Sequence, residues 1–221
     1  LQPLNWREDG WPEIGEPLDD MGKGQPVLNP EHPALPSTLY ELQASDDFTQ
    51  GHPGPQWQWQ ANPQQTWRGG RAGGLLLRCV PHAGSLYSMP QLLLQKFPAE
   101  RFSVIASLHG CFVQPGDEAG LVIYGERFAA LSLVRGDAGI QLRFRHGWNS
   151  DRGELVETSL LVADDVETDI ALGFHVDYDG ISRFCYRLPG GEWHDVTPLF
   201  SAGAGKWVGA RFGIYAARSD V

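Results

Sequence analysis

The sequence predicts an all-β protein in which two antiparallel sheets pack as a sandwich or jelly roll. Three observations predict this fold. Apolar and polar residues alternate with a period of two in several segments after residue 38, turns rich in Gly, Pro and Asp separate them, and no amphipathic helical pattern exceeds three turns. Of the 221 residues, 42% are hydrophobic, which is enough for one sandwich domain with a substantial core.

Residues 1–38 differ from the rest of the chain because prolines interrupt them throughout. These are Pro3, Pro12, Pro17, Pro26, Pro30, Pro33 and Pro36. No helical or strand period survives there, so we expect a Pro-rich extended arm with little secondary structure of its own. Trp6 and Trp11 are unusual in a free linker, and we expect both to dock on a surface. Residues 39–221 then form the sandwich.

The segments that follow place apolar side chains on one face and polar or small side chains on the other. A sandwich strand shows this pattern because one of its faces is buried and the other is solvated. The predicted buried rows are Phe102, Val104, Ala106 and Leu108; Ile140, Leu142 and Phe144; Ile170, Leu172, Phe174, Val176 and Tyr178; Phe184, Tyr186 and Leu188; and Ala210, Phe212, Ile214 and Ala216.

Turns and polar rows complete the predicted sandwich. The Asp179-Gly180 pair lies between two alternating runs and predicts a hairpin. A curved sheet in such a fold leaves a concave outer face. We expect that face to carry Gln141, Arg143 and Arg145, which alternate with the buried row of their strand.

Composition excludes several classes of partner. The formal net charge is −10 without a basic block, which argues against nucleic acid because phosphate contacts need clustered Lys and Arg. Purely apolar runs such as Gly73–Leu77 are far shorter than the ~20 residues that span a bilayer, so we expect no membrane partner. The start of the chain lacks a signal-peptide pattern.

Cys79, Cys111 and Cys185 lack disulfide or zinc spacing, so we expect mostly buried, reduced thiols in a cytoplasmic bacterial protein, with secretion left open.

No catalytic or metal-binding constellation stands out. A glycosidase needs two facing carboxylates, but the acidic residues here form adjacent pairs or lie in connections, as solvated turn residues do. No Gly-x-Ser-x-Gly elbow is present, and the seven histidines lack metal-ligand spacing. We therefore predict no catalytic residue, no metal ligand and no cofactor, although the turn Gly116-Asp117-Glu118 leaves a structural calcium open.

Aromatic and amide side chains offer the chemistry that a neutral polysaccharide needs. Aromatic rings stack on sugar rings and amides bind hydroxyls. In the run Trp57–Pro63 the two tryptophans share one strand face, which is more often a core face, and the amides share the other face. The candidate carbohydrate-binding residues are Gln58, Trp59, Gln60, Asn62, Tyr124, Gln141, Arg143, Arg145, Trp148 and Trp193.

Several segments together resemble the C-terminal β-sandwich of glycoside hydrolase family 43 β-xylosidases and arabinofuranosidases. The segments that match this family in order are Ser45-Asp46-Asp47-Phe48, Trp57–Pro63, Leu93–Pro98, Gly116–Leu121 and Lys206–Ile214, the last as a penultimate strand. The resemblance covers most of the chain. It implies a concanavalin A-like jelly roll, also classed as carbohydrate-binding module family 91, which binds xylan.

The resemblance extends to the N-terminal arm, and the chain departs from the family pattern in two respects. Leu1–Trp6 and Asp9–Pro12 are similar to the last strand of the family's catalytic propeller and the linker after it. The carboxylates of that propeller are absent, so the resemblance implies that this chain hydrolyses nothing alone. Family members continue into a final strand after the segment Phe212–Ile214, which leaves a missing edge strand open. The family's sandwich lends a loop to the propeller's active site, which we place around Arg211.

Two functions from different classes follow. In the first, the chain is a non-catalytic module that binds xylan or xylo-oligosaccharide through stacking and hydrogen bonding on an open face. In the alternative, it is a structural domain that docks on the catalytic propeller of its parent enzyme and helps close the active site without binding sugar. A free-standing sandwich hydrolase is a third, less favoured hypothesis.

Overall fold

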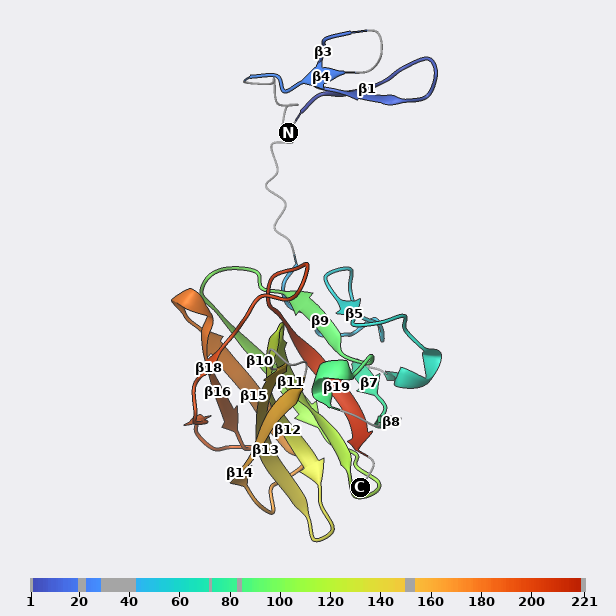
Figure 1. Cartoon of the computed structure of the whole chain (residues 1–221). Coiled ribbons are helices and arrows are strands. Elements are labelled where there is room, and N and C mark those ends of the chain that lie inside the picture. Colours follow the sequence, from blue (N-terminus) through green and yellow to red (C-terminus); the bar gives the residue numbers. More distant parts are fainter. Residues whose placement is uncertain are drawn as a thin grey trace. The chain divides into compact units, whose positions relative to one another are not determined.

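The computed structural model describes residues 2–19, 23–28, 43–71, 73–82, 85–149 and 154–219 (Figure 1). Within them the chain is all-β, as predicted. It separates into two compact units, Leu1–Leu42 and Gln43–Val221. In the described ranges no helix has the length and apolar character needed to cross a membrane.

The first unit contains short hairpins where the sequence predicts little secondary structure. Strand β1 (Leu4–Trp6) pairs with β2 (Pro12–Ile14), and β3 (Glu16–Pro17) pairs with β4 (Gly24–Gln25). Prolines fit here because they stand at strand ends in two-stranded ribbons, where the missing N–H faces no partner. Trp6 and Trp11 are largely exposed, so their docking stays a prediction. Residues 29–38 of the predicted arm lie outside the described residues.

The second unit is built around an eight-stranded sheet. Its strands are β5 (Gln58–Trp59), β8 (Val80–His82), β9 (Leu93–Lys96), β11 (Asp117–Tyr124), β12 (Arg127–Arg135), β13 (Ile140–Asn149), β14 (Leu155–Ala163) and β19 (Arg211–Ser219). Their order is β14-β13-β12-β11-β19-β9-β5. Neighbours are antiparallel, and β8 adds a short parallel pairing to the end of β19.

A five-stranded sheet forms the opposite layer. Its strands are β10 (Phe102–His109), β15 (Asp169–Val176), β16 (Ile181–Arg187), β17 (His194–Asp195) and β18 (Phe200–Ser201), in the order β10-β15-β16, with β17 and β18 both beside β16. Outside both sheets lie the hairpin β6 (Arg68–Arg71) with β7 (Gly74–Leu77) and the short helices η1 (Gln65–Trp67), η2 (Leu86–Ser88) and η3 (Tyr178–Gly180).

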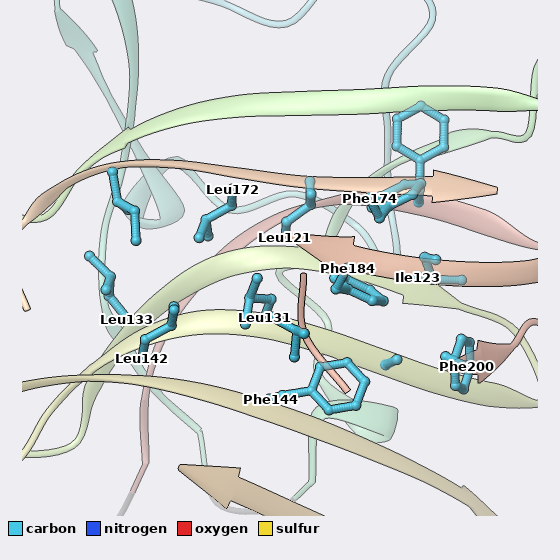
Figure 2. Close-up of a cluster of buried hydrophobic side chains, with 14 of the residues drawn as sticks. Leu121, Ile123, Leu131, Leu133, Leu142, Phe144, Leu172, Phe174, Phe184 and Phe200 are labelled. Carbon is cyan, nitrogen blue, oxygen red and sulfur yellow. The ribbon is translucent and has the colours of Figure 1, made fainter. Parts of the chain in front are cut away.

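The main core lies between the two sheets and contains members of every predicted alternating row, together with apolar residues of β11 and β12 that the predicted rows do not include. In Figure 2, Leu131 and Phe144 of one sheet and Phe174 and Phe184 of the other surround a common interior. The rings of Phe144 and Phe184 are 5.3 Å apart. Burial of each such side chain contributes ~1.5–3 kcal/mol, so these rows fix which face of each strand turns inward. Tyr178 is an exception, because β15 ends before it and leaves its ring exposed.

The predicted hairpin is confirmed. Strands β15 and β16 are joined by η3, in which Asp179 and Gly180 adopt φ values of 64° and 73°. Two consecutive positive φ angles suit the right-handed twist of the paired strands, and Asp-Gly adopts them at little cost.

A second apolar cluster covers part of the outer face of the eight-stranded sheet, so the expected open polar face is wrong there. The cluster contains Leu86, Met89, Leu92, Leu94, Val122, Tyr124, Phe128, Ala130, Tyr215 and Ala217. The segment around η2 packs over β11, β12 and β19 and supplies the first members. The central strand β19 is consequently buried on both faces, with Phe212 turned to one cluster and Tyr215 to the other.

The three cysteines form no disulfide. The expectation of mostly buried thiols is wrong, since Cys111 is exposed and Cys79 and Cys185 are half-buried. Burial raises the pKa of the Cys79 thiol to about 11, which keeps it protonated at neutral pH.

Candidate functional site

The tryptophan and amide segment forms a shorter strand than its pattern predicts. Strand β5 contains only Gln58 and Trp59, and Asn62 lies exposed in a bend beyond it. The ring of Trp59 is half-buried against Trp67, with 5.4 Å between ring centroids. Gln58 is exposed. The segment therefore does not present a continuous row of amides on one strand face.

Tyr124 is buried rather than available for stacking. Its side chain is 6% exposed inside the second apolar cluster, and its hydroxyl donates to the carbonyl of Tyr87 at 2.7 Å. The amide of Gln60 donates to the same hydroxyl at 3.3 Å. The guanidinium of Arg211 lies over the Tyr124 ring at 5.2 Å. These contacts engage the hydroxyl of Tyr124 and the amide nitrogen of Gln60, two predicted contact residues, within the fold itself.

The polar row of β13 faces outward as predicted, but its members bind neighbouring side chains. Both Nε and Nη2 of Arg143 donate to Oε1 of Gln141, at 2.9 and 2.7 Å. Arg145 forms ion pairs with Glu118 at 2.8 Å and Glu157 at 3.4 Å. A ligand would have to compete with these partners for the donors that they occupy.

A buried polar network surrounds Glu118. Besides Arg145, the hydroxyls of Ser132, at 2.8 Å, and Tyr215 donate to the same carboxylate oxygen. Burial raises the pKa of the Tyr215 hydroxyl, and the adjacent carboxylate raises it further, so it remains a donor. Removing one partner from a buried pair of this kind costs about 3–5 kcal/mol, which gives the network a structural role.

The carboxylate of Asp117, the residue before Glu118, is also hydrogen-bonded to donors of the protein. Asp117 accepts the backbone amides of Val113 and Gln114, at 2.8 and 3.2 Å, and Nε of Arg218 at 2.6 Å. Its oxygens are directed at donors of the protein rather than at a common cation position. Within the described ranges no group of three or more His, Cys, Asp or Glu side chains is placed to hold a metal ion.

Trp193 lies on the outer face of the five-stranded sheet and is 38% exposed. Its ring approaches β15 at Gly173, where a Cβ atom would lie 3.4 Å from the indole, and the Arg187 guanidinium lies 5.0 Å from the ring centroid. Two shallow hollows open on the same face. One of about 500 Å³ is lined by residues such as Ser107 and Arg187, and one of about 350 Å³ by residues such as His175.

Three exposed aromatic side chains gather at one end of the sandwich, which we call the aromatic end. They are Trp148 at the end of β13, Tyr178 in the hairpin η3 and Trp207 in the loop between β18 and β19. Trp148 is 40% exposed and Trp207 is 90% exposed.

Hydrogen bonds and strand register bring the end of β13, the hairpin η3 and the loop before β19 to the same end of the sandwich. The amide of Ala202 donates to the carbonyl of Gly180, and the amide of Glu126 donates to Ala204, both at 2.9 Å. Glu126 lies in the turn between β11 and β12, and the next residue, Arg127, lies opposite Trp148 of β13. In Figure 1 the loop before β19 lies at the end of the sandwich that is opposite the tip of the β19 arrow.

Trp207 is the residue whose position sequence reasoning missed. The segment Lys206–Ile214 is predicted as a continuous strand, but β19 begins only at Arg211 and the first five residues form a loop. Arg211, the predicted loop residue, instead packs on Tyr124. Gly203, Gly205 and Gly209 around the tryptophan are the signal that could have indicated a loop.

Comparison with known proteins agrees with this architecture. A family model described as the beta xylosidase C-terminal Concanavalin A-like domain matches residues 45–220. A putative beta-xylosidase of Xylanibacter ruminicola is 28% identical over 96% of this chain and 38% of its own length. A beta-xylosidase of Formosa agariphila is 24% identical over 97% of the chain and 39% of its own length. The chain thus spans about two fifths of these relatives.

Solved structures share the fold. The xylan beta-1,4-xylosidase of Bacillus halodurans superposes with a TM-score of 0.66 at 22% identity, over 98% of this chain and 43% of the other. A glycoside hydrolase family 43 protein of Bacillus licheniformis gives 0.68 at 21% identity, over 98% and 42%. The matched region is the C-terminal module of such proteins, and their catalytic propeller is not part of this chain. The chain therefore belongs to the family of beta-xylosidase C-terminal concanavalin A-like domains.

Proposed function

We propose that this chain is a non-catalytic module of a xylosidase-type glycoside hydrolase, and that its aromatic end docks on the catalytic propeller and helps close the substrate site. The observation that carries this proposal is the 90% exposure of Trp207 in a loop anchored at its base. This function is the structural alternative predicted from the sequence, with the loop now assigned to residues before Arg211.

An exposed tryptophan of this kind favours a partner surface. A large aromatic side chain in water forgoes its burial energy, and aromatic anchors of this type dominate binding at protein interfaces. Val208 beside Trp207 is also exposed, as are Trp148 at the end of β13 and Tyr178 in η3. Clustered exposed apolar groups mark interaction sites more often than scattered ones do.

The outer face of the eight-stranded sheet supports sugar binding less well. Tyr124 is buried there, and the guanidinium groups of Arg143 and Arg145 are already bonded to Gln141 and Glu118. Binding a sugar through them would first cost the existing hydrogen bonds, each worth about 1 kcal/mol or more.

The docking is tested by mixing the chain with the separately produced catalytic domain of the Xylanibacter ruminicola relative and measuring affinity by calorimetry. We expect Trp207→Ala to weaken binding at least about tenfold, as loss of a central aromatic anchor does. The control is Val113→Ala, which removes an exposed apolar side chain from the opposite end of the sandwich, next to the start of β11. Absence of binding by the unaltered chain, or equal effects of both variants, contradicts the proposal.

Xylan binding remains a second candidate, now located on the outer face of the five-stranded sheet. The observation that favours it is the exposed Trp193 ring beside Arg187, a residue that lines the larger of the two hollows. Affinity electrophoresis in soluble xylan tests this candidate. Retardation that is lost in Trp193→Ala supports it, and unchanged mobility at high xylan concentration excludes it.

A further inference from the structure

A row of three side chains crosses the larger of the two hollows on the outer face of the five-stranded sheet. Ser107 of β10 lies opposite Ala171 of β15, and Ala171 lies opposite Arg187 of β16. Neighbouring strands are about 4.8 Å apart, so the side chains of Ser107 and Arg187 stand about 10 Å apart with only a methyl group between them. Residues 188–191 complete the lining of this hollow, whose volume of about 500 Å³ is that of a small-ligand site.

Arg187 is the charged residue of this hollow that the fold leaves without a counter-ion. Two other arginines at the same sheet are paired, Arg101 with Asp177 at 3.1 Å and Arg183 with Asp195 at 3.2 Å. In the part of the chain that the structure describes, no carboxylate forms an ion pair with Arg187. Acidic residues outnumber basic ones by 27 to 17, so carboxylates are plentiful, yet none is placed here.

Trp193 holds the Arg187 guanidinium in place without using its hydrogen-bond donors. The guanidinium carbon lies over the indole, 5.0 Å from the ring centroid. The indole itself rests on β15 at Gly173, where a Cβ atom would lie 3.4 Å from the ring. A guanidinium stacked on an aromatic ring keeps its N–H groups at its edge, where they match the two oxygens of a carboxylate.

The other polar groups of the hollow limit the kind of anion that it would accept. The Asp169 carboxylate lines the hollow and contacts the ring of His109, so a phosphate or another multiply charged anion would be repelled. The Ser103 hydroxyl lies 2.9 Å from Nδ1 of His175, whereas the Ser107 hydroxyl has no hydrogen-bond partner among the described residues. The hollow therefore offers a site for one carboxylate and, across the methyl group of its floor, a site for one hydroxyl.

We propose that this hollow binds a sugar acid, such as a hexuronate group carried by a polysaccharide, with its carboxylate on Arg187 and a ring hydroxyl on Ser107. A sugar acid combines a single negative charge with hydroxyls around one compact ring, which is the combination that the row presents. The proposal rests on the second candidate function, sugar binding at the Trp193 face. It is independent of docking by the aromatic end, because the hollow lies at the end of β10 and β15 that is remote from η3.

A titration of the full chain with sodium glucuronate at constant ionic strength tests the proposal, followed by backbone amide shifts in NMR spectra. We expect saturable shifts at Ser107 and residues 188–191, with millimolar affinity because the hollow is shallow. Arg187→Gln should weaken binding at least about tenfold, as loss of a charged hydrogen bond does. The matched control, Arg183→Gln, removes an arginine of the same strand that is already paired with Asp195, and should leave the affinity unchanged.

Two further probes separate the sugar acid from other ligands. We expect xylose, which has no carboxylate, and N-acetylglutamate, which has no sugar ring, each to bind at least about tenfold more weakly than glucuronate. Absence of saturable shifts at the hollow, equal effects of the two arginine variants, or equal affinity for either probe overturns the proposal. Glucuronate binding without retardation by neutral xylan would exclude the second candidate function for neutral xylan and leave this proposal standing. Xylan retardation without glucuronate binding would overturn this proposal alone.

Discussion

Asp117 shows how single charged residues are held in this fold. Burial alone would raise the pKa of its carboxyl, but hydrogen bonds from Arg218 and from the amides of Val113 and Gln114 outweigh that effect and hold the pKa below its usual value. A carboxylate whose pKa is lower in the folded state stabilises the fold above its unfolded-state pKa. The contribution is lost as the pH falls through the folded-state pKa.

The Asp117→Asn variant tests this contribution. We expect it to be less stable at pH 7 by about 1 kcal/mol, below the ~1.5–3 kcal/mol of a charged hydrogen bond, because solvent reaches Arg218 and screens the pair. The difference from the unaltered chain should shrink as the pH falls below about 4, where the unfolded carboxyl is protonated. Urea unfolding at a series of pH values measures it, and a difference independent of pH contradicts the assignment.

The ion-pair partners of Asp117 and Glu118 could not be predicted from the sequence. The sequence indicates that Asp117 and Glu118 sit at the start of a strand after a glycine turn, and a solvated turn is the ordinary interpretation. In the structure they meet Arg218 and Arg145, which are distant in sequence and become neighbours only when β11 lies beside β19 and near β13. Alternation predicts the face of a side chain, but not which strand lies beside it.

At the scale of elements, the hairpin between β15 and β16 depends on Gly180. Its φ of 73° is strained for any residue with a Cβ atom, and a Cβ there would also lie 3.2 Å from the carbonyl oxygen of Ala202. We expect Gly180→Ala to cost about 1–2 kcal/mol of folding stability. Thermal unfolding measures this cost. Gly209→Ala is the control, because a Cβ at Gly209 meets nothing within 4 Å, and an equal loss in both variants would contradict the interpretation.

The long alternating strands are predictable and the short or interrupted ones are not. The inward rows of β10, β13, β15 and β16 follow the sequence pattern because burial of one face dominates their energetics. Strand β5 and the segment before β19 share the alternating pattern. However, β5 leaves its sheet after two residues, and the second segment joins the sheet only at Arg211. Tertiary packing decides these boundaries, and this is why Trp59 and Trp207 lie elsewhere than predicted, whereas Tyr124 is buried because the segment around η2 covers its strand.

At the scale of the molecule, the sandwich carries its own core. Every residue of both apolar clusters belongs to the unit Gln43–Val221. We therefore expect a chain of residues 43–221 to unfold within about 2 °C of the full chain, since 1 kcal/mol shifts the midpoint by roughly 2–4 °C at this size. Scanning calorimetry measures the midpoint. A fall of several times that interval would show that the first unit stabilises the sandwich.

The central claim is that the aromatic end of the sandwich helps build the substrate site of a catalytic propeller. The most direct test joins this chain to the catalytic domain of the Xylanibacter ruminicola relative, in place of its own matching region, and measures kcat/KM on an aryl xyloside. We predict that Trp207→Ala lowers kcat/KM at least about tenfold, or about 1.4 kcal/mol, while Val113→Ala leaves it nearly unchanged. Equal activity of the two variants and the unaltered fusion would contradict the account.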